Sequence, residues 1–176
     1  MRKSNAIFFE SVIPFLKNKN FDNFICCELE LDGTKLKKID KDWKIDWLTT
    51  FEEELVGIAA RVSSFNGFTI RKYSRGYQSE YFQIPNLISK KDFPINPDNF
   101  YVFQIETTEV NNKKIPTKLH VIKTSSLFSF VKENENKVEC FTNRNDGNEF
   151  VFVSIEILLS NKIKHWTIDL TKGIQD

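Results

Sequence analysis

Apolar and polar residues alternate most regularly along the stretch 44–62. Residues 44–51 predict one strand and residues 54–62 predict a second, and Glu52 and Glu53 supply the turn between them. Two strands joined by such a short turn pair in the antiparallel sense. The pattern therefore predicts a β-hairpin in the first half of the chain.

The N-terminal segment has the spacing of a helix. A first helix is predicted over residues 4–18, where Ser4 or Asn5 caps the start and apolar residues supply one side. Pro14 predicts a kink or an early end, because proline lacks the N–H that a helix interior uses. The polar, lysine-rich residues 34–44 predict a loop.

The remaining apolar runs predict strands and short helices. Thr124 is expected to cap a short helix whose inner side carries Leu127 and Val131. The apolar run 150–159 predicts a buried strand. The other predicted strands cover residues 23–31, 68–73, 100–107 and 118–123, and residues 165–170 predict a last strand or a tail. Residues 74–99 predict a short helix and a loop.

This order of elements predicts one α+β domain over residues 1–176, with a central mixed or antiparallel sheet flanked by helices. A chain of this length fills one hydrophobic core. Its apolar runs are all shorter than the 18 residues that a membrane helix needs, and the N-terminus makes a poor signal peptide. We expect a cytoplasmic protein with no membrane partner.

Charge and composition limit how the chain could bind nucleic acid or zinc. The net charge is +1, so a nucleic-acid partner has to be held by a local basic patch and not by a global field. The three cysteines form no C-x-x-C pair, and only two histidines are present, which argues against a structural zinc site.

The register of the hairpin gives the first candidate site. If Phe51 pairs with Glu54 across the turn, Asp46 lies opposite Ala59. Ala59 and the nearby Gly57 are the smallest side chains available, and they would leave room for a ligand to approach Asp46. The sequence therefore predicts an accessible carboxylate in the middle of a strand.

Strand alternation also places Asp46 on one face with Lys44 and Arg61. Two interpretations of Asp46 follow. It is a metal ligand in an active site, which the low preference of aspartate for strand interiors favours. Alternatively, it forms a salt bridge with Lys44 or Arg61 on the face of the sheet.

The segments Ile45-Asp46-Trp47 and Val56 to Val62 resemble the hairpin motif of the PD-(D/E)XK, or restriction-endonuclease-like, nucleases. In that family an Asp faces a Glu or Gln on the next strand, a Lys follows two residues later, and the acids hold Mg²⁺. The resemblance implies a restriction-endonuclease-like fold and a DNA endonuclease of the restriction or phage-defence type. It further implies Mg²⁺ or Mn²⁺ as the cofactor and, by analogy, a homodimer.

The motif departs from the family pattern at two positions. Ala59 stands at the acidic position and Arg61 at the lysine position, and arginine keeps the charge but cannot be deprotonated. A second acid must then come from another element, with Glu80 the first candidate and Glu10 the second. The resemblance thus implies Asp46, Glu80 and Glu10 as metal ligands, and Asp46, Arg61 and Glu80 as catalytic residues.

Two basic segments are candidates for contact with nucleic acid. Residues 35–44 could meet phosphates through Lys44 and stack a base on Trp43, or form a solvated loop whose acids dilute the charge. The second segment would lie beside Asp46 if the strand 68–73 joins the same sheet. Its basic residues are Arg71, Lys72 and Arg75.

Two non-catalytic functions stay open. The changes at positions 59 and 61 favour an inactive relative of the nucleases that binds DNA or a protein partner through the same face. Near-zero net charge and 17 phenylalanines would instead suit a small interaction protein, such as a phage inhibitor or an immunity factor. His120, inside an apolar strand, is expected to be a core or edge residue.

Overall fold

The computed structural model describes residues 3–29, 35–74, 77–78, 80–143 and 147–171. The elements of the first half are α1 (Lys3–Ile7), the π-helical η1 (Phe8–Val12), α2 (Ile13–Lys17), β1 (Phe21–Cys26), the 3₁₀ turn η2 (Cys27–Leu29), α3 (Lys35–Trp43), β2 (Trp47–Phe51), β3 (Glu54–Ser63), β4 (Gly67–Ser74) and β5 (Tyr77–Gln78). The elements of the second half are α4 (Glu80–Ile88), the 3₁₀ turn η3 (Pro97–Asn99), β6 (Phe100–Val110), β7 (Lys113–Lys123), α5 (Thr124–Glu133), β8 (Glu139–Thr142), β9 (Glu149–Ser154), α6 (Ile155–Ser160) and β10 (Trp166–Asp169).

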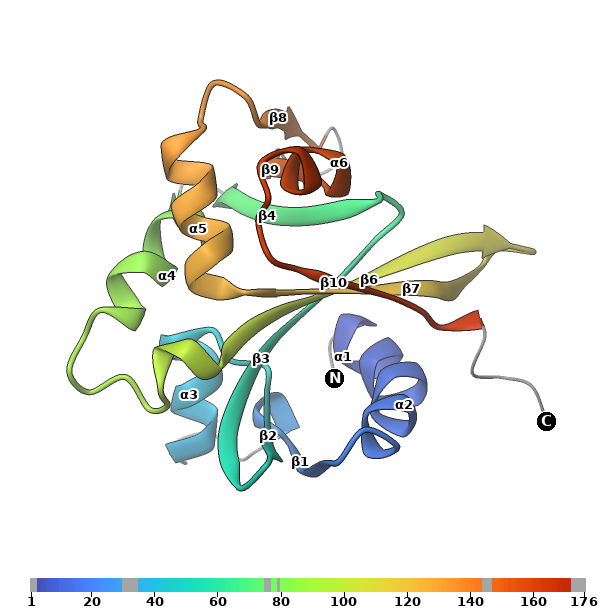
Figure 1. The fold of residues 1–176 in the computed structure, drawn as a ribbon, viewed down its shortest axis with the longest axis vertical. Helices are drawn as coiled ribbons and strands as arrows, with labels where there is room; N and C mark the ends of the chain where they lie inside the picture. The colour runs from blue at the N-terminus through green and yellow to red at the C-terminus, as the bar shows by residue number, and fades with distance from the viewer. Residues whose placement is uncertain (1–2, 30–34, 75–76, 79, 144–146, 172–176) are drawn as a thin grey trace.

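The strands form two sheets, and β4 lies across the strands of the larger sheet (Figure 1). Sheet A has six strands in the order β1-β2-β3-β6-β7-β10, and sheet B has four in the order β5-β4-β9-β8. The pair β3 and β6 is parallel, which makes sheet A mixed. The α+β class with a mixed sheet is therefore confirmed, whereas the prediction of a single sheet is wrong.

After β3 the chain leaves sheet A, and β4 pairs with β9 of sheet B. The two strands come very close at Gly67. A Cβ added at Gly67 would collide with the backbone carbonyl of Val153, so only glycine permits this approach. The fully buried Gln104 of β6 then joins the two sheets. Its Oε1 accepts the backbone N–H of Thr69 at 3.1 Å, and its Nε2 donates to Ser63 Oγ at 3.2 Å.

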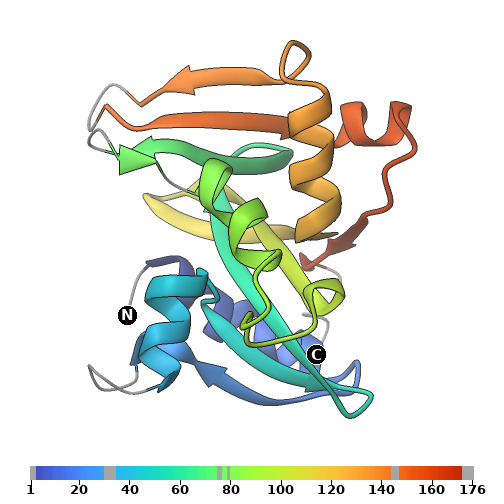
Figure 2. The ribbon, with the colours of Figure 1, turned by 90° about the vertical axis from the view of Figure 1, so that its left-hand side faces the viewer.

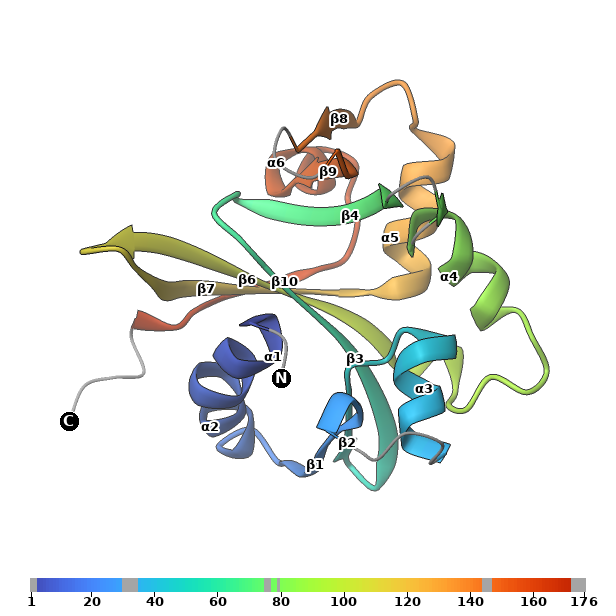
Figure 3. The same ribbon diagram turned by 180° about the vertical axis from the view of Figure 1, so that it is seen from behind.

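Each face of sheet A covers its own hydrophobic core. One core lies between sheet A, sheet B and the helices α3, α4 and α5, which follow one side of the molecule (Figure 2). The other core lies between sheet A and the N-terminal helical segment, seen from behind in Figure 3. Trp47 and Phe103 belong to the second core, and Leu48 and Val102 belong to the first.

The N-terminal helical segment continues past Pro14, although proline interrupts a regular α-helix. Helical structure runs without a break from α1 through η1 to α2, and Pro14 occupies the first turn of α2. The wider π turn immediately before Pro14 absorbs the lost helical bond. The predicted helix over residues 4–18 is thus confirmed, and it buries Phe8, Val12 and Leu16. The predicted cap is wrong, because Ser4 and Asn5 lie inside α1 and not before it.

Three local predictions are wrong. The predicted loop 34–44 contains α3, and the predicted strand 150–159 divides into β9 and α6 at Ser154, whose Oγ accepts the N–H of Ile157 at 3.2 Å. Thr124 does not cap α5, because Lys123 holds the N-cap position without a side-chain bond. In the described ranges no helix has the length and apolar character needed to cross a membrane.

Candidate functional site

The predicted register of the central hairpin is confirmed. Phe51 pairs with Glu54, and each preceding pair follows in step up to Trp47 and Ile58. Glu52 and Glu53 both have positive φ, 49° and 68°, which is the backbone of the tight turn that such hairpins prefer. The hairpin therefore places the motif residues on neighbouring strands.

Asp46 lies one residue before β2, where the strand departs from regular geometry. Lys44 has a φ of 61°, which turns the incoming chain away from the ladder. The backbone N–H of Asp46 still donates to Ile58 at 2.9 Å. Its carboxylate Oδ2 accepts the N–H of Ala60 at 2.8 Å and Nη1 of Arg61 at 2.9 Å. The carboxylate thus substitutes for the carbonyl that a continued strand would offer to β3.

Arg61 closes this site from the solvent side. Its Nη1 also donates to the carbonyl of Ala60 at 2.8 Å, which fixes the guanidinium against the strand. The side chain of Asp46 is 4% exposed and that of Arg61 is 21% exposed. The salt-bridge interpretation of Asp46 is therefore confirmed in geometry, with Arg61 as the partner. Lys44 instead donates to the Lys41 carbonyl at 2.7 Å, at the end of α3.

The predicted open space beside Asp46 is filled by the protein itself. A Cβ at Gly57 would lie 2.5 Å from Ile95 Cδ1 and 3.4 Å from the side chain of Ile45. Ala59 is 1% exposed and belongs to the core between the sheets. The expectation that small residues leave room for a ligand is wrong, because distant apolar side chains pack into that room.

The other two candidate metal ligands do not complete a described site. Glu10 is exposed on η1, in the helical segment that covers the second core. Glu80 begins α4, and its side chain lies outside the part of the chain that the structure describes. Among the described residues, no three His, Cys, Asp or Glu side chains converge as metal ligands do.

The second basic segment lies in sheet B and not beside the hairpin. β4 pairs with β9 and β5, so the expectation that it would extend the sheet next to Asp46 is wrong. Arg71 lies over the ring of Phe150, 5.7 Å from its centroid, and Lys72 falls at an irregularity in the β4–β9 register. Arg75 lies outside the described residues.

The first basic segment becomes a coherent surface once it is helical. Leu36, Ile39 and Trp43 face inward from α3, and Lys38, Lys41 and Asp42 between them are exposed. Trp43 contacts Phe93 edge to face, with centroids 5.5 Å apart, and Lys90 Nζ lies 5.6 Å from the Trp43 ring. These contacts join α3 to the segment 89–94. Residues 35–44 and 89–94 carry exposed and half-buried lysines that we call the lysine surface: Lys35, Lys38, Lys41, Lys44, Lys90 and Lys91.

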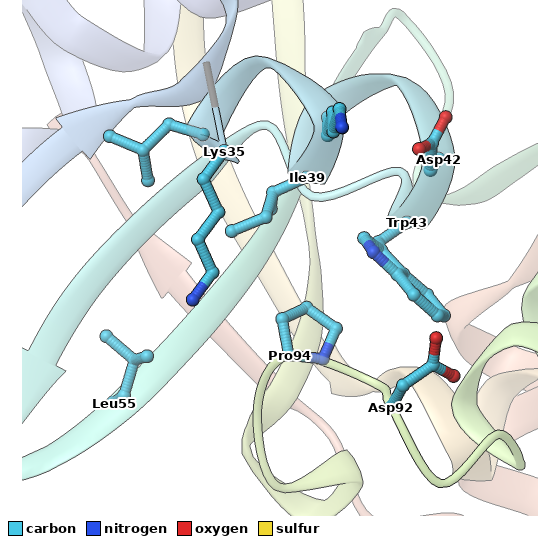
Figure 4. Close-up of a pocket in the computed structure, with 9 residues that line it drawn as sticks. Lys35, Ile39, Asp42, Trp43, Leu55, Asp92 and Pro94 are labelled. Carbon is cyan, nitrogen blue, oxygen red and sulfur yellow. The ribbon is translucent and has the colours of Figure 1, made fainter. Parts of the chain in front are cut away.

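A hollow of about 580 Å³ opens on this surface between α3, the start of β3 and the segment 89–94 (Figure 4). Ile39, Leu55 and Pro94 give it apolar walls. The Lys35 ammonium reaches into one end, and Trp43 and the Asp92 carboxylate lie together at the other end. Asp42 also lines the hollow, but its carboxylate points away from the centre (Figure 4). The volume is typical of small-ligand sites.

A second polar cluster on sheet A centres on a buried histidine. His120 is fully buried on β7, with Nδ1 2.9 Å from Thr167 Oγ1 and Nε2 3.1 Å from Glu106 Oε2. Burial lowers the pKa of His120, and the hydrogen bond that Glu106 accepts from the imidazole offsets part of that effect. The prediction that His120 is a core or edge residue is confirmed.

Sequence reasoning missed Lys90 and Asp92 as parts of the first surface. These residues are far from Trp43 in the sequence, so no spacing of residues near either segment predicts that they lie together. The helix itself had a signal, since Leu36, Ile39 and Trp43 recur at three- and four-residue intervals. The density of lysine in this segment hid that period.

Comparison with known proteins adds no family. The chain matches no protein-family model, no curated protein and no solved structure.

Proposed function

We propose that this chain is a nucleic-acid-binding protein that does not cleave DNA at Asp46, and that it binds through the lysine surface. The observation that carries this proposal is the concentration of positive charge on α3 and the segment 89–94. The lysine surface has six lysines, and residues 35–44 and 89–94 that carry it contain three aspartates, whereas the whole chain carries a net charge of +1. A local excess of ammonium groups is what phosphate binding requires.

The position of Asp46 supports the non-catalytic part of the proposal. A metal ion bound to Oδ2 of Asp46 would have to displace the guanidinium of Arg61 and compete with the N–H of Ala60 for the same oxygen. Removing Arg61 from its place would leave a charged group without compensation near the protein interior, which is costly. We infer that Asp46 stabilises the junction of β2 and β3 and holds no cofactor.

The binding test is fluorescence anisotropy with labelled 20-nucleotide DNA, single-stranded and duplex, at low salt. Changing Lys38 and Lys90 together to alanine should weaken binding roughly fivefold, because each lysine contributes a phosphate contact. The matched control is Lys113→Ala with Lys114→Ala, which removes two exposed lysines at the tip of the β6–β7 hairpin. Equal losses in both double variants would overturn the assignment of this surface.

The second candidate function is Mg²⁺-dependent endonuclease activity with Asp46, Arg61 and Glu80 as catalytic residues. One observation favours it: Asp46, one residue before β2, and Arg61 of β3 lie within 2.9 Å of each other, at motif positions of the predicted hairpin. Thermal unfolding with and without Mn²⁺ separates the two functions. A metal centre at Asp46 would raise the unfolding temperature of the natural protein and not that of Asp46→Asn. Our proposal predicts no difference.

A further inference from the structure

The hollow beside Trp43 carries groups of opposite charge at opposite ends. The Lys35 ammonium reaches in from the start of α3, and Asp92 places its carboxylate next to the Trp43 ring (Figure 4). The walls between them are apolar, from Ile39 and Pro94. A complementary ligand therefore has an anionic end, a flat apolar middle and hydrogen-bond donors at the far end.

We propose that this hollow is a seat for one unpaired guanine of a single-stranded nucleic acid, an inference that rests on the proposed function. The phosphate beside the base would meet Lys35. The base would lie against the apolar walls and Trp43, since aromatic side chains are common stacking platforms for unpaired bases. The far edge of the base would meet Asp92.

The chemistry of Asp92 selects the base. An ionised carboxylate has two acceptor oxygens and no donor. Guanine presents two adjacent donors, N1–H and the N2 amino group, on its Watson–Crick edge, so both carboxylate oxygens are satisfied. Thymine presents one N–H between two carbonyl oxygens that would face the carboxylate and repel it. Asp92 therefore favours guanine over thymine.

The same reasoning selects single strands. In a duplex the Watson–Crick edge of guanine is already paired with cytosine and is turned away from the protein. Only an unpaired base can turn that edge toward Asp92. A duplex would still contact the lysine surface through its phosphates, without using the hollow.

The test compares two labelled single-stranded oligonucleotides, one of 12 thymidines and one with a single central dG, by fluorescence anisotropy. The natural protein should bind the dG oligonucleotide about tenfold more tightly, as one bidentate base contact provides. The same pair made as RNA, with uridines and one guanosine, shows whether the sugar matters to the preference. Equal binding of the two DNA oligonucleotides would overturn the guanine seat but leave the proposed function standing. Absence of any binding would overturn both.

Asp92→Asn gives the decisive variant because two explanations predict opposite signs. If Asp92 accepts from guanine, the change should remove the preference by weakening only the dG oligonucleotide. If Asp92 merely repels phosphate, the change should tighten both oligonucleotides equally, which would contradict the proposal. Asp92 is exposed, so its replacement leaves the fold intact. The matched control is Glu109→Gln, which removes an exposed acid at the far end of β6.

Discussion

The two charged regions of this molecule, the Asp46–Arg61 pair and the lysine surface, treat their charges in opposite ways. Asp46 is 4% exposed, and its carboxylate oxygen is held by Arg61 and a backbone N–H. The lysine surface carries its ammonium groups at the solvent boundary, around an open hollow. The resemblance to a nuclease motif points to the first region, and the accessible chemistry lies in the second.

The difference teaches that a motif's residues do not by themselves define a site. Asp46, one residue before β2, meets Arg61 of β3 at 2.9 Å, but Ile95 and Ile45 fill the space beside Gly57 that was expected to be open. When a charge pair is closed off in this way, removing one partner destabilises the fold because the other charge loses its compensation. A charge left in solvent contributes little to stability and remains available to ligands.

The largest effect that tests this contrast is the loss of Asp46. Asp46→Ala should lower the free energy of unfolding by about 3 kcal/mol, because it leaves Arg61 and a buried N–H without their acceptor. Urea unfolding measures the change. Asp46→Asn should cost less, since its amide oxygen still accepts from Ala60. An unchanged midpoint for Asp46→Ala would contradict a structural role.

Filling the space at Gly57 should cost somewhat less. Gly57→Val is expected to destabilise the protein by about 2 kcal/mol, since its Cβ would meet the end of Ile95. Ile95→Ala in the same chain should recover part of that loss, and the double-mutant cycle measures the coupling. An open active-site cleft would instead accept Gly57→Val without loss and show no coupling.

The buried histidine predicts a pH dependence of intermediate size. Burial lowers the pKa of His120 below its usual 6.5, so the unfolded chain takes up the proton first as pH falls. Well above pH 6.5 His120 is neutral in both the folded and the unfolded chain, so its titration does not change the free energy of unfolding. Below that pH stability should fall, by at most about 1.4 kcal/mol per pH unit, until the folded-state pKa is passed.

Urea unfolding between pH 7.5 and 5 tests this prediction. His120→Gln should flatten the slope, because glutamine does not titrate. A natural protein that gains stability on acidification would show that Glu106 attracts the proton more strongly than burial repels it.

The smallest expected effect concerns the lysine surface. In Lys38→Ala with Lys90→Ala, the slope of log affinity against log salt for single-stranded DNA should fall in magnitude by about 1.4, or 0.7 per lost phosphate contact. Anisotropy titrations at several NaCl concentrations provide the slope. The thermal stability of this variant should stay within about 0.5 kcal/mol of the natural protein, unlike that of Asp46→Ala.

Sequence reasoning predicted the elements whose information is local. The hairpin register followed from alternation and from the turn at Glu52-Glu53, and β3, β4, β6 and β7 all lie where apolar runs predicted strands. The α+β class with a mixed sheet followed from their order. Local periodicity is the part of the fold that one sequence records.

The features that could not be predicted from the sequence depend on contacts between residues far apart in the chain. Nothing near Gly57 in the sequence indicates that Ile95 packs beside it, and nothing near Gly67 indicates that β4 leaves for a second sheet. The hollow needs Asp92 to meet Trp43, which lies far away in the chain. Tertiary packing of this kind decides whether a candidate residue is accessible, and the pattern of apolar and polar residues near it in the sequence does not predict that packing.

The measurement that tests the central claim most directly is incubation of the purified protein with supercoiled plasmid in Mg²⁺ or Mn²⁺, with Asp46→Asn in parallel. A gel without metal confirms that the protein retards the plasmid. Our account predicts retardation with no nicking by either protein under any metal condition. Metal-dependent nicking by the natural protein that is lost in Asp46→Asn would contradict the account and establish Asp46 as catalytic.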